Sequence, residues 1–287
     1  MAVTNPAPPE ARHVPMLVVR GGRGRLSVDT LRENWEFREV FRSFVIRRIK
    51  VKYKQATVGV GWAVLQPVLA ALIFAVFFGH LAKVPSDGIP YLLFALAGTV
   101  VWSYFSSAAG LAMESMVLDQ GLVKKVYFPR EFLPLSAVVA GLLDLGAATA
   151  TLMVVAGLYG IGPAISWIAL PIPMLIAVLT CAAFGLFASA INTYYRDARH
   201  AMPFILQLIM YLSPVLYPLS IVPAQWQLPY AILNPLAGSI DGFREIVLKG
   251  GWGGAEITVA SLVSSFVYFV LAYAGFKYVE RGFTDRV

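Results

Sequence analysis

A basic run of residues ends abruptly where a long apolar stretch begins, between residues 41 and 67 of this 287-residue chain. The basic side chains are Arg42, Arg47, Arg48, Lys50, Lys52 and Lys54. Residues 59–81, which follow, carry no ionisable side chain other than His80. At about 1.5 Å per residue, an apolar helix of that length crosses a hydrocarbon core about 30 Å thick. The pattern predicts a transmembrane helix preceded by a basic segment at the lipid headgroups.

Five further apolar stretches follow, at residues 91–113, 132–159, 165–191, 202–219 and 257–276. Hydrophobic residues make up 58% of the chain and charged residues 14%, and the mean hydropathy is +0.70, which excludes a soluble globular domain. The sequence therefore predicts an all-α integral membrane protein with six transmembrane helices. The single Cys181 excludes an intrachain disulfide.

The lysines and arginines are distributed unevenly around these stretches. Six spans place both termini on one side of the membrane, and 20 of the 23 Lys and Arg residues then fall on that side. The positive-inside rule predicts a multi-pass protein of the plasma (inner) membrane with both termini in the cytoplasm. Because the net charge of +7 lies beside the spans, it indicates contact with anionic membrane lipids rather than with nucleic acid.

Three segments are expected along the chain. Residues 1–26, rich in Pro, Gly and Arg, are predicted to be a flexible cytoplasmic tail. Residues 27–56 are predicted to form an amphipathic interface helix with a basic juxtamembrane segment, and residues 57–280 the transmembrane domain. The interface helix anchors the chain to anionic lipid or docks a cytoplasmic partner, and in the second case its contact residues are Trp35, Arg38, Phe41 and Arg42.

Residues 220–256 are too apolar for an ordinary loop and too interrupted for a span. Pro223, Pro229, Pro235 and the glycines of residues 250–254 divide them into two short stretches, 228–233 and 239–248. Re-entrant half-helices between the fifth and sixth spans fit this pattern, because irregular backbone survives at membrane depth only where protein or a water cavity satisfies it. An amphipathic hairpin on the outer surface is the alternative.

Motifs for catalysis and metal binding are missing from the sequence. It contains no HExxH, no paired cysteines, no GxSxG and no Walker A sequence GxxxxGK[ST]. We therefore expect no metal site, no cofactor and no enzymatic activity in this chain, which cannot hydrolyse ATP by itself.

Asp144 is the only acidic residue within the six apolar stretches. A proton-coupled transporter would need such a group, but it would also need charged partners in other spans. The alternative, which we favour, is a protonated or hydrogen-bonded aspartate that holds helices together.

Aromatic residues make up 13% of the chain, and several lie near the ends of spans. Most aromatic rings at such positions belong to the belts that form at the headgroup level. The alternative is an aromatic lining for a conduit, because sugar rings stack on aromatic planes. The candidates for such a lining are Tyr53, Trp62, Trp102, Tyr211 and Tyr217.

Residues 119–131, DQGLVKKVYFPRE, form a compact segment between the second and third spans. Asp119 is expected to cap a short helix, and Pro129 to force Phe128 out of helical geometry. We expect apolar side chains to be exposed beside basic ones, as on a protein docking site or on a loop lying on anionic lipid. The exposed apolar residues are Leu122, Val123, Val126, Tyr127 and Phe128, and the basic ones are Lys124, Lys125 and Arg130. The candidate residues for contact with a partner are Leu122, Lys124, Lys125, Tyr127, Phe128, Pro129 and Arg130.

Four stretches together carry a resemblance to a known family. They are IKVKYKQATVGVGWAVLQP at 49–67, GLVKKVYFPREFLPL at 121–135, NTYYRDARHAMPFILQ at 192–207, and SPVLYPLSIVP through NPLAGSIDGFRE at 213–245. The chain resembles the transmembrane subunits of ABC-2 type polysaccharide exporters, which move O-antigen, capsule, teichoic acid and related lipid-linked glycans. Residues 1–24 exceed the family pattern.

The resemblance implies a homodimer with two copies of a cytoplasmic ABC ATPase subunit that binds ATP and Mg. Residues 121–130 would be the coupling helix, 31–44 the interface helix, 194–199 a second cytoplasmic contact, and the re-entrant pair the outer gate. The residues expected to contact the diphosphate of the lipid carrier are Arg47, Arg48, Lys50, Lys52 and Lys54; positive-inside topology alone explains them equally well.

Other functions differ in the features they require. An ABC-2 permease for a small hydrophobic drug or lipid would differ only in its cargo. A membrane glycosyl- or phospho-transferase would need clustered acids or histidines, and a secondary transporter would need internal repeats. The sequence shows neither feature.

Overall fold

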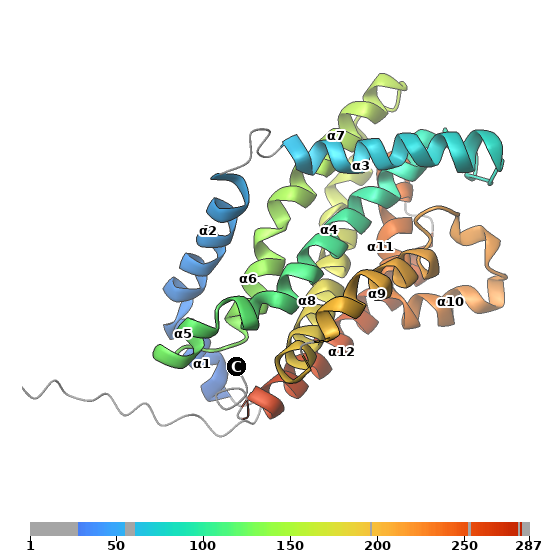
Figure 1. Ribbon diagram of the computed structural model, residues 1–287. Helices are drawn as coiled ribbons and strands as arrows, with labels where there is room; N and C mark the ends of the chain where they lie inside the picture. The colour runs from blue at the N-terminus through green and yellow to red at the C-terminus, as the bar shows by residue number, and fades with distance from the viewer. Residues whose placement is uncertain (1–27, 55–60, 196, 252–253, 281, 283–287) are drawn as a thin grey trace, which may run out of the picture.

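The computed structural model describes residues 28–54, 61–195, 197–251, 254–280 and 282, and within them the ordered backbone is helical with no strand (Figure 1). The predicted all-α class is confirmed. The predicted tail, residues 1–26, lies outside the described residues, as do residues 55–60 at the start of the first predicted span and Arg196 in the second cytoplasmic contact.

The helices follow one another with short connections. Their bounds are α1 (Val28–Glu36), α2 (Arg38–Lys54), α3 (Gly61–Phe74) with η1 (Ala75–Leu81), α4 (Tyr91–Leu118), α5 (Gln120–Lys125), α6 (Phe132–Ala140), α7 (Leu142–Leu158), η2 (Ile165–Ala169), α8 (Pro171–Tyr194), α9 (Ala198–Leu212), η3 (Leu219–Ile221), α10 (Ala224–Leu233), α11 (Pro235–Phe243) with η4 (Arg244–Lys249), and α12 (Ala255–Val279).

Five helical stretches of the described chain are long and apolar enough to cross a membrane. They are Gly61–Leu81, Tyr91–Leu118, Phe132–Leu158, Ile165–Tyr194 and Ala255–Val279. They coincide with five of the six predicted spans to within a few residues at most ends, because an apolar segment in lipid must satisfy its own peptide groups as a helix.

The fifth predicted span, residues 202–219, is helical only as far as Leu212. The 15 residues of α9 rise about 22 Å, less than a hydrocarbon core of about 30 Å. The helix ends because Pro214 disfavours helical geometry at Ser213, which adopts an extended conformation with ψ 148°. The prediction of a continuous helix to Leu219 is therefore wrong.

The two ends of the bundle carry different elements. At one end α1, α5 and the C-terminal end of α12 gather, and at the other the chain folds through η3 and α10 (Figure 1). We call these the α5 end and the hairpin end, and we use the word hairpin from here on for the helix pair α10–α11. The central helix α4 packs against α3, α6, α7 and α8, and close approach is possible because a β-carbon at Gly185 of α8 would lie only 2.7 Å from that of Ala112.

Helices α10 and α11 form the predicted re-entrant pair. α10 packs on α12, and α11 packs on α12, α8 and α4, so that nearly all of α11 is buried. A β-carbon at Gly238 would collide with Ser261 of α12, which shows how closely the two helices approach. The burial of α11 fits a half-helix held within the protein. In α10 only Ala231 is buried, so this helix lies at the surface of the described chain.

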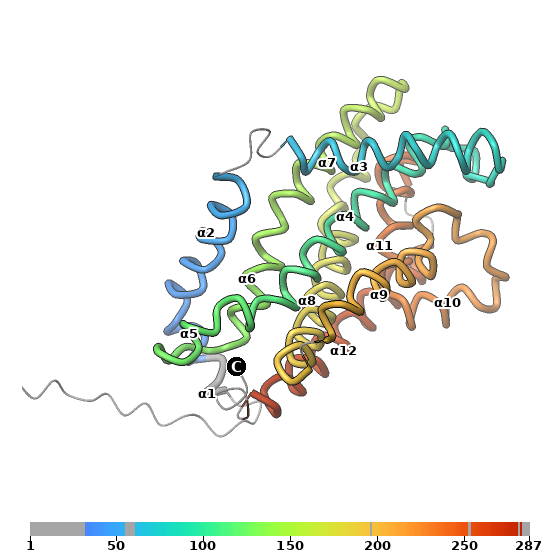
Figure 2. The backbone as a smooth tube through the Cα atoms, in the orientation of Figure 1, coloured from blue at the N-terminus to red at the C-terminus, as the bar shows by residue number. Residues whose placement is uncertain are grey.

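The predicted interface helix is two helices, and the second takes an unexpected course. α1 and α2 are separated at Phe37, and α2 runs lengthwise beside α6 (Figure 2). Phe41 of α2 meets Phe132, and Arg48 meets Ser136, so the two helices run in the same direction. The segment therefore packs on the bundle instead of lying apart from it.

Candidate coupling surface and basic cavity

Aromatic rings of α2 and of Phe37, which directly precedes it, pack on the segment of residues 126–132. Phe37 and Tyr127 have ring centroids 6.2 Å apart, Phe41 and Phe132 5.1 Å, and Phe44 and Phe128 5.0 Å. The three α2-side rings recur at steps of four and three residues, which places them on one helical face. Each pair meets edge to face, the arrangement that aromatic quadrupoles favour.

The coupling segment, residues 119–131, is less exposed than its sequence predicts. Phe128 is only 4% exposed and Val123 6%, because both join a buried cluster with Met116, Leu133 and Phe276. Their predicted exposure is wrong, and Pro129 is also buried. Of the predicted residues, Lys124, Lys125, Val126 and Tyr127 are exposed, while Leu122 and Arg130 are half-buried.

The four candidates on the interface helix separate into two groups. Trp35 is 70% exposed, and the Arg38 guanidinium lies 5.2 Å from the centroid of its ring. Arg42 is exposed as well, whereas Phe41 packs on Phe132. A docking role of these residues stays a prediction, for which Trp35, Arg38 and Arg42 offer the accessible surface.

Two of the basic candidates converge on Asp119, the residue before α5. Arg47 Nη2 lies 2.9 Å from Asp119 Oδ1, and Arg48 Nη2 3.2 Å from Asp119 Oδ2. Arg48 also donates to Ser136 Oγ at 2.8 Å and to the backbone oxygen of Leu133 at 3.2 Å. Burial lowers the pKa of the Arg48 guanidinium, and the Asp119 carboxylate opposes that shift.

A second anchor of α2 lies at the first turn of α7. The Lys52 ammonium and the Tyr53 hydroxyl both bond to the Asp144 carboxylate. The interpretation of Asp144 as a hydrogen-bonded link between helices agrees with these contacts. Its Lys52 partner was not expected, because Lys52 belongs to α2 rather than to a span. Lys50 and Lys54 are exposed.

A cavity of about 850 Å³ opens between α2, α4, α6 and α9, and we call it the basic cavity. Its charged lining residues are Arg47, Arg48, Lys52, Arg199, Glu114 and Asp119, so positive charge is in excess. A smaller cavity of about 200 Å³ adjoins it and shares Lys52, Tyr53 and Ser107. Trp62, Gln66 and Asp144 are among the other residues that line the smaller cavity. Together the two cavities offer cationic, hydroxyl, amide and aromatic groups.

The predicted conduit aromatics lie in three places. Tyr53 and Trp62 line the smaller cavity. Tyr211 and Tyr217 lie at the hairpin end, where the Tyr217 hydroxyl donates to the backbone oxygen of Tyr211 at 3.2 Å. Trp102 packs on the core beside Phe105, with ring centroids 5.7 Å apart. The described chain thus brings together two pairs and leaves Trp102 apart.

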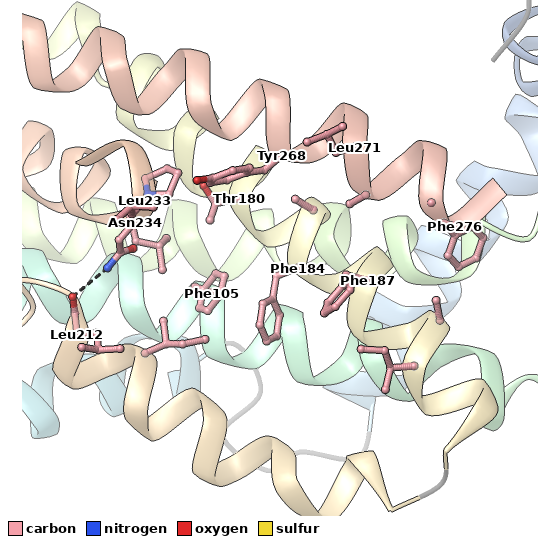
Figure 3. Close-up of a pocket in the computed structure, with 18 of the residues that line it drawn as sticks. Phe105, Thr180, Phe184, Phe187, Leu212, Leu233, Asn234, Tyr268, Leu271 and Phe276 are labelled. Carbon is pink, nitrogen blue, oxygen red and sulfur yellow. Dashed lines mark hydrogen bonds between the residues drawn. The ribbon is translucent and has the colours of Figure 1, made fainter. Parts of the chain in front are cut away.

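A third cavity, of about 990 Å³, lies between α8, α9, α12 and the hairpin (Figure 3). Its lining is mainly apolar and includes Phe184 and Phe187 of α8 and Leu271 of α12. Asn234 at its edge donates to the backbone oxygen of Leu212 at 3.0 Å. No pattern in the sequence had indicated this cavity.

The non-helical backbone after α9 is bonded by side chains from other elements. Tyr230 and Asn234 donate to the backbone oxygen of Leu212, and Tyr91 donates to that of Leu216 at 2.7 Å. Arg244 donates to the backbone oxygens of Val215, Tyr217 and Phe94 at 2.8, 3.4 and 3.3 Å. Sequence reasoning missed Arg244; the available signal was an arginine in the mainly apolar stretch 239–248, close to Asp241 and Glu245.

Comparison with known proteins identifies the family to which this chain belongs. The profile described as ABC-2 type transporter matches residues 39–248, about three quarters of the chain. The chain belongs to the ABC-2 type transporter family. It is a multi-pass inner-membrane permease rather than an ATPase, and membership implies an ABC ATPase as its partner.

Several relatives align over most of their length. The chain is 27% identical to an O-antigen export system permease protein RfbA of Klebsiella pneumoniae, over 83% of this chain and 90% of that protein. It is 26% identical to the protein of the same name of Myxococcus xanthus, over 90% and 98%. A polysialic acid transport protein KpsM of Escherichia coli is 25% identical over 76% and 85%.

Proposed function

We propose that this chain is the transmembrane subunit of an ATP-driven exporter that moves a lipid-linked polysaccharide, such as O-antigen, capsule or a teichoic-acid-like glycan, out of the cytoplasm. The observation that carries the proposal is the alignment with the Myxococcus xanthus permease named for O-antigen export, which covers 98% of that protein. A permease for a small hydrophobic drug or lipid is the alternative.

The proposed assembly is a homodimer with two cytoplasmic ATPase subunits, which hold the ATP and Mg. The α5 end then faces the cytoplasm, as do both termini, in agreement with the distribution of lysine and arginine. Exposed Lys124, Lys125, Val126 and Tyr127 provide the contact with the ATPase, since an aromatic ring beside basic groups is typical of docking sites.

The basic cavity is the proposed site for the diphosphate of the lipid carrier. Arg47, Arg48 and Lys52 line it, and anions form strong charge-assisted hydrogen bonds with such groups. In the absence of cargo, Asp119 and Asp144 neutralise these cations. Exposed Lys50 and Lys54 lie on the same helix and add to the attraction of the headgroup. Tyr53 and Trp62 then offer ring planes to the first sugars.

Deletion of the gene tests the cargo directly. We expect surface glycan to be lost and lipid-linked glycan to accumulate in the cytoplasm, with both restored by the wild-type chain. The variant Arg47→Gln with Arg48→Gln tests the proposed diphosphate site, and it should insert normally but restore less export. Normal surface glycan in the deletion strain, together with sensitivity to small hydrophobic drugs, would instead support the alternative cargo.

A further inference from the structure

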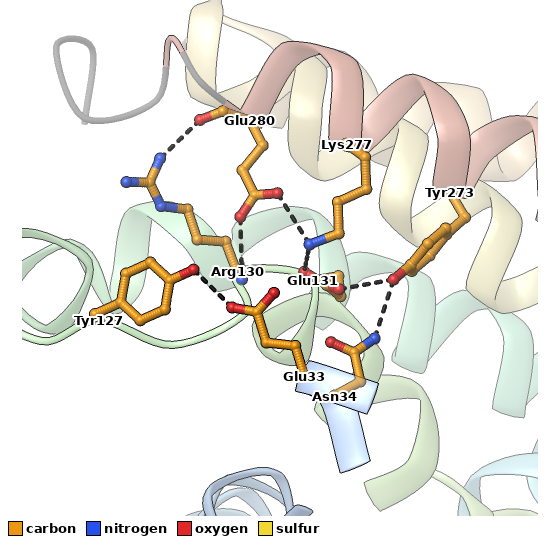
Figure 4. A network of polar contacts seen from close by, with 8 residues as sticks. All are labelled: Glu33, Asn34, Tyr127, Arg130, Glu131, Tyr273, Lys277 and Glu280. Atoms are coloured by element: carbon orange, nitrogen blue, oxygen red, sulfur yellow. Dashed lines mark hydrogen bonds and ion pairs between the residues drawn. The ribbon is translucent and has the colours of Figure 1, made fainter. Parts of the chain in front are cut away.

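Glu131 is a buried carboxylate at the end of the coupling segment. It is 0% exposed, and it accepts hydrogen bonds from Tyr273 Oη at 2.8 Å and from Lys277 Nζ at 2.7 Å (Figure 4). Lys277, itself only 13% exposed, also lies 3.1 Å from Glu280. Glu131 comes directly before α6, and its partners belong to α12. An ion pair thus joins two elements that are about 140 residues apart in sequence.

Other contacts extend this junction in both directions. The Arg130 guanidinium donates to the backbone oxygen of Glu280 at 2.7 Å. On the opposite side, Tyr127 Oη donates to Glu33 of α1 at 2.6 Å, and Asn34 of α1 donates to Tyr273 Oη at 3.0 Å (Figure 4). The coupling segment, α1 and the end of α12 therefore form one polar network.

Helix α12 connects this network to the hairpin. It has 25 residues and no proline, so it extends about 37 Å as one uninterrupted helix. In the first half of α12, Ser261 Oγ donates to the backbone oxygen of Ala231 at 3.3 Å, and at the middle of the helix Tyr268 Oη donates to that of Ile232 at 3.0 Å. Both acceptors belong to α10. The same helix is thus bonded to the coupling segment at its C-terminal end and to the hairpin between its first turns and its middle.

We propose that Glu131 is a positioning residue that, through Lys277 and α12, transmits movement of the coupling segment to the hairpin α10–α11. The inference rests on the proposed function, in which an ATPase moves the coupling segment. Separating the pair would leave an uncompensated charge in a buried site, so the segment and α12 move together. A solvent-exposed ion pair could not impose this constraint, because water replaces either partner at little cost in free energy.

The double variant distinguishes an ion pair that only stabilises the fold from one that also transmits movement, because the two differ in whether coupling is restored. Replacing both charged partners by neutral groups is generally tolerated by folded proteins, whereas removing one partner is not. A structural pair would therefore be rescued fully in Glu131→Gln with Lys277→Met. A transmitting pair would regain stability in the double variant but would not regain coupling.

The test uses the full transporter with its ATPase in proteoliposomes, and compares both single variants, the double variant and Glu256→Gln. Glu256 is exposed at the opposite end of α12 and serves as the matched control. We expect glycan transported per ATP hydrolysed to fall by about tenfold in Glu131→Gln and in the double variant, a typical size for coupling between sites. Glu256→Gln should match the wild type. If a single variant does not insert, the double variant carries the test.

A second readout follows the hairpin itself. Trp226 of α10 is 59% exposed, so a label on Trp226→Cys reports on the hairpin, while buried Cys181 stays unlabelled. We expect a nucleotide-dependent change in label accessibility that is lost in the double variant. Wild-type coupling and hairpin response in the double variant would overturn the inference. Absence of ATP-dependent transport in the unmodified chain would contradict the proposed function instead.

Discussion

Phe44 of α2 and Phe128 of the coupling segment meet edge to face, with their ring centroids 5.0 Å apart and their planes at 64°. Phe128 is 4% exposed, whereas Tyr127 beside it is 45% exposed. Two adjacent aromatic residues therefore have different roles: one fixes the segment to α2, and the other faces outward, where we place the ATPase.

Phe128→Ala should destabilise the protein by about 3–5 kcal/mol, the usual cost of removing a buried aromatic ring. Tyr127→Ala should leave the unfolding temperature close to the wild-type value but lower glycan transport per ATP hydrolysed. Thermal unfolding in detergent and coupled transport assays measure the two effects. Equal loss of stability in both variants would contradict this division.

Tyr127→Phe is the matched control for the hydroxyl group. Burial and the hydrogen bond to Glu33 raise the pKa of Tyr127, so its hydroxyl remains a donor at physiological pH. The phenylalanine keeps the ring and loses only this bond. We expect ATPase binding to persist in Tyr127→Phe, and its loss there would assign the contact to the hydroxyl rather than to the ring.

Arg48→Met should cost about 1–3 kcal/mol, because the backbone oxygen of Leu133 and the Asp119 carboxylate lose a donor. Lys50→Met, on the exposed face of the same helix, should change stability by less than about 0.5 kcal/mol. Chemical denaturation of the two variants provides the comparison. A similar cost at both positions would show that α2 does not depend on its bonds to the coupling segment.

Asp144→Leu should release the C-terminal part of α2, because Lys52 and Tyr53 both lose their acceptor. Hydrogen exchange of residues 48–54 should become faster, while that of residues 38–44 should not change. Asp144→Leu with Lys52→Met serves as the double variant, and its exchange should be no faster than that of the single variant. Unchanged exchange in Asp144→Leu would contradict the anchor.

Protonation of Glu280 makes the free energy of unfolding depend on pH. Burial raises the pKa of Glu280 above its usual 4.5, although Lys277 opposes the shift, and Glu131 adds to it. The folded chain thus binds this proton more tightly than the unfolded chain, so the contribution is present below about pH 4.5 and is lost as pH rises through the raised pKa. The unfolding temperature of the wild type minus that of Glu280→Gln should therefore be lower at pH 7 than at pH 4.5.

Much of the fold follows from the sequence, because lipid allows few alternatives. Five spans and the hairpin were predictable from apolar length and from the prolines that interrupt residues 220–256. The end of α9 was also marked, by Pro214, but apolar composition continues past it and concealed the break. Hydropathy measures the environment of a segment and says little about where its helix ends.

The contacts of the site depended on partners that are distant in sequence. From the sequence, Glu131 is an ordinary loop residue, and only the structure shows its bonds to Tyr273 and Lys277 of α12. In the same way, the sequence does not show that Phe44 covers Phe128. The basic residues of α2 were predictable as a group, but their division between Asp119 and Asp144 required the parallel packing of α2 on α6. Helix periodicity specifies a face and leaves its partner open.

The non-helical backbone after α9 depends on the hairpin for its hydrogen bonds. Side chains of the hairpin, from Tyr230 to Arg244, bond carbonyl groups that water would otherwise hydrate, so the protein itself replaces the solvent there. In the proposed transport cycle, outward movement of the hairpin would remove these donors, and the exposed carbonyl groups would recruit water. Opening of the hairpin end would then hydrate the passage for the glycan at the same moment, which suits a cargo whose sugar hydroxyls must exchange one shell of hydrogen bonds for another.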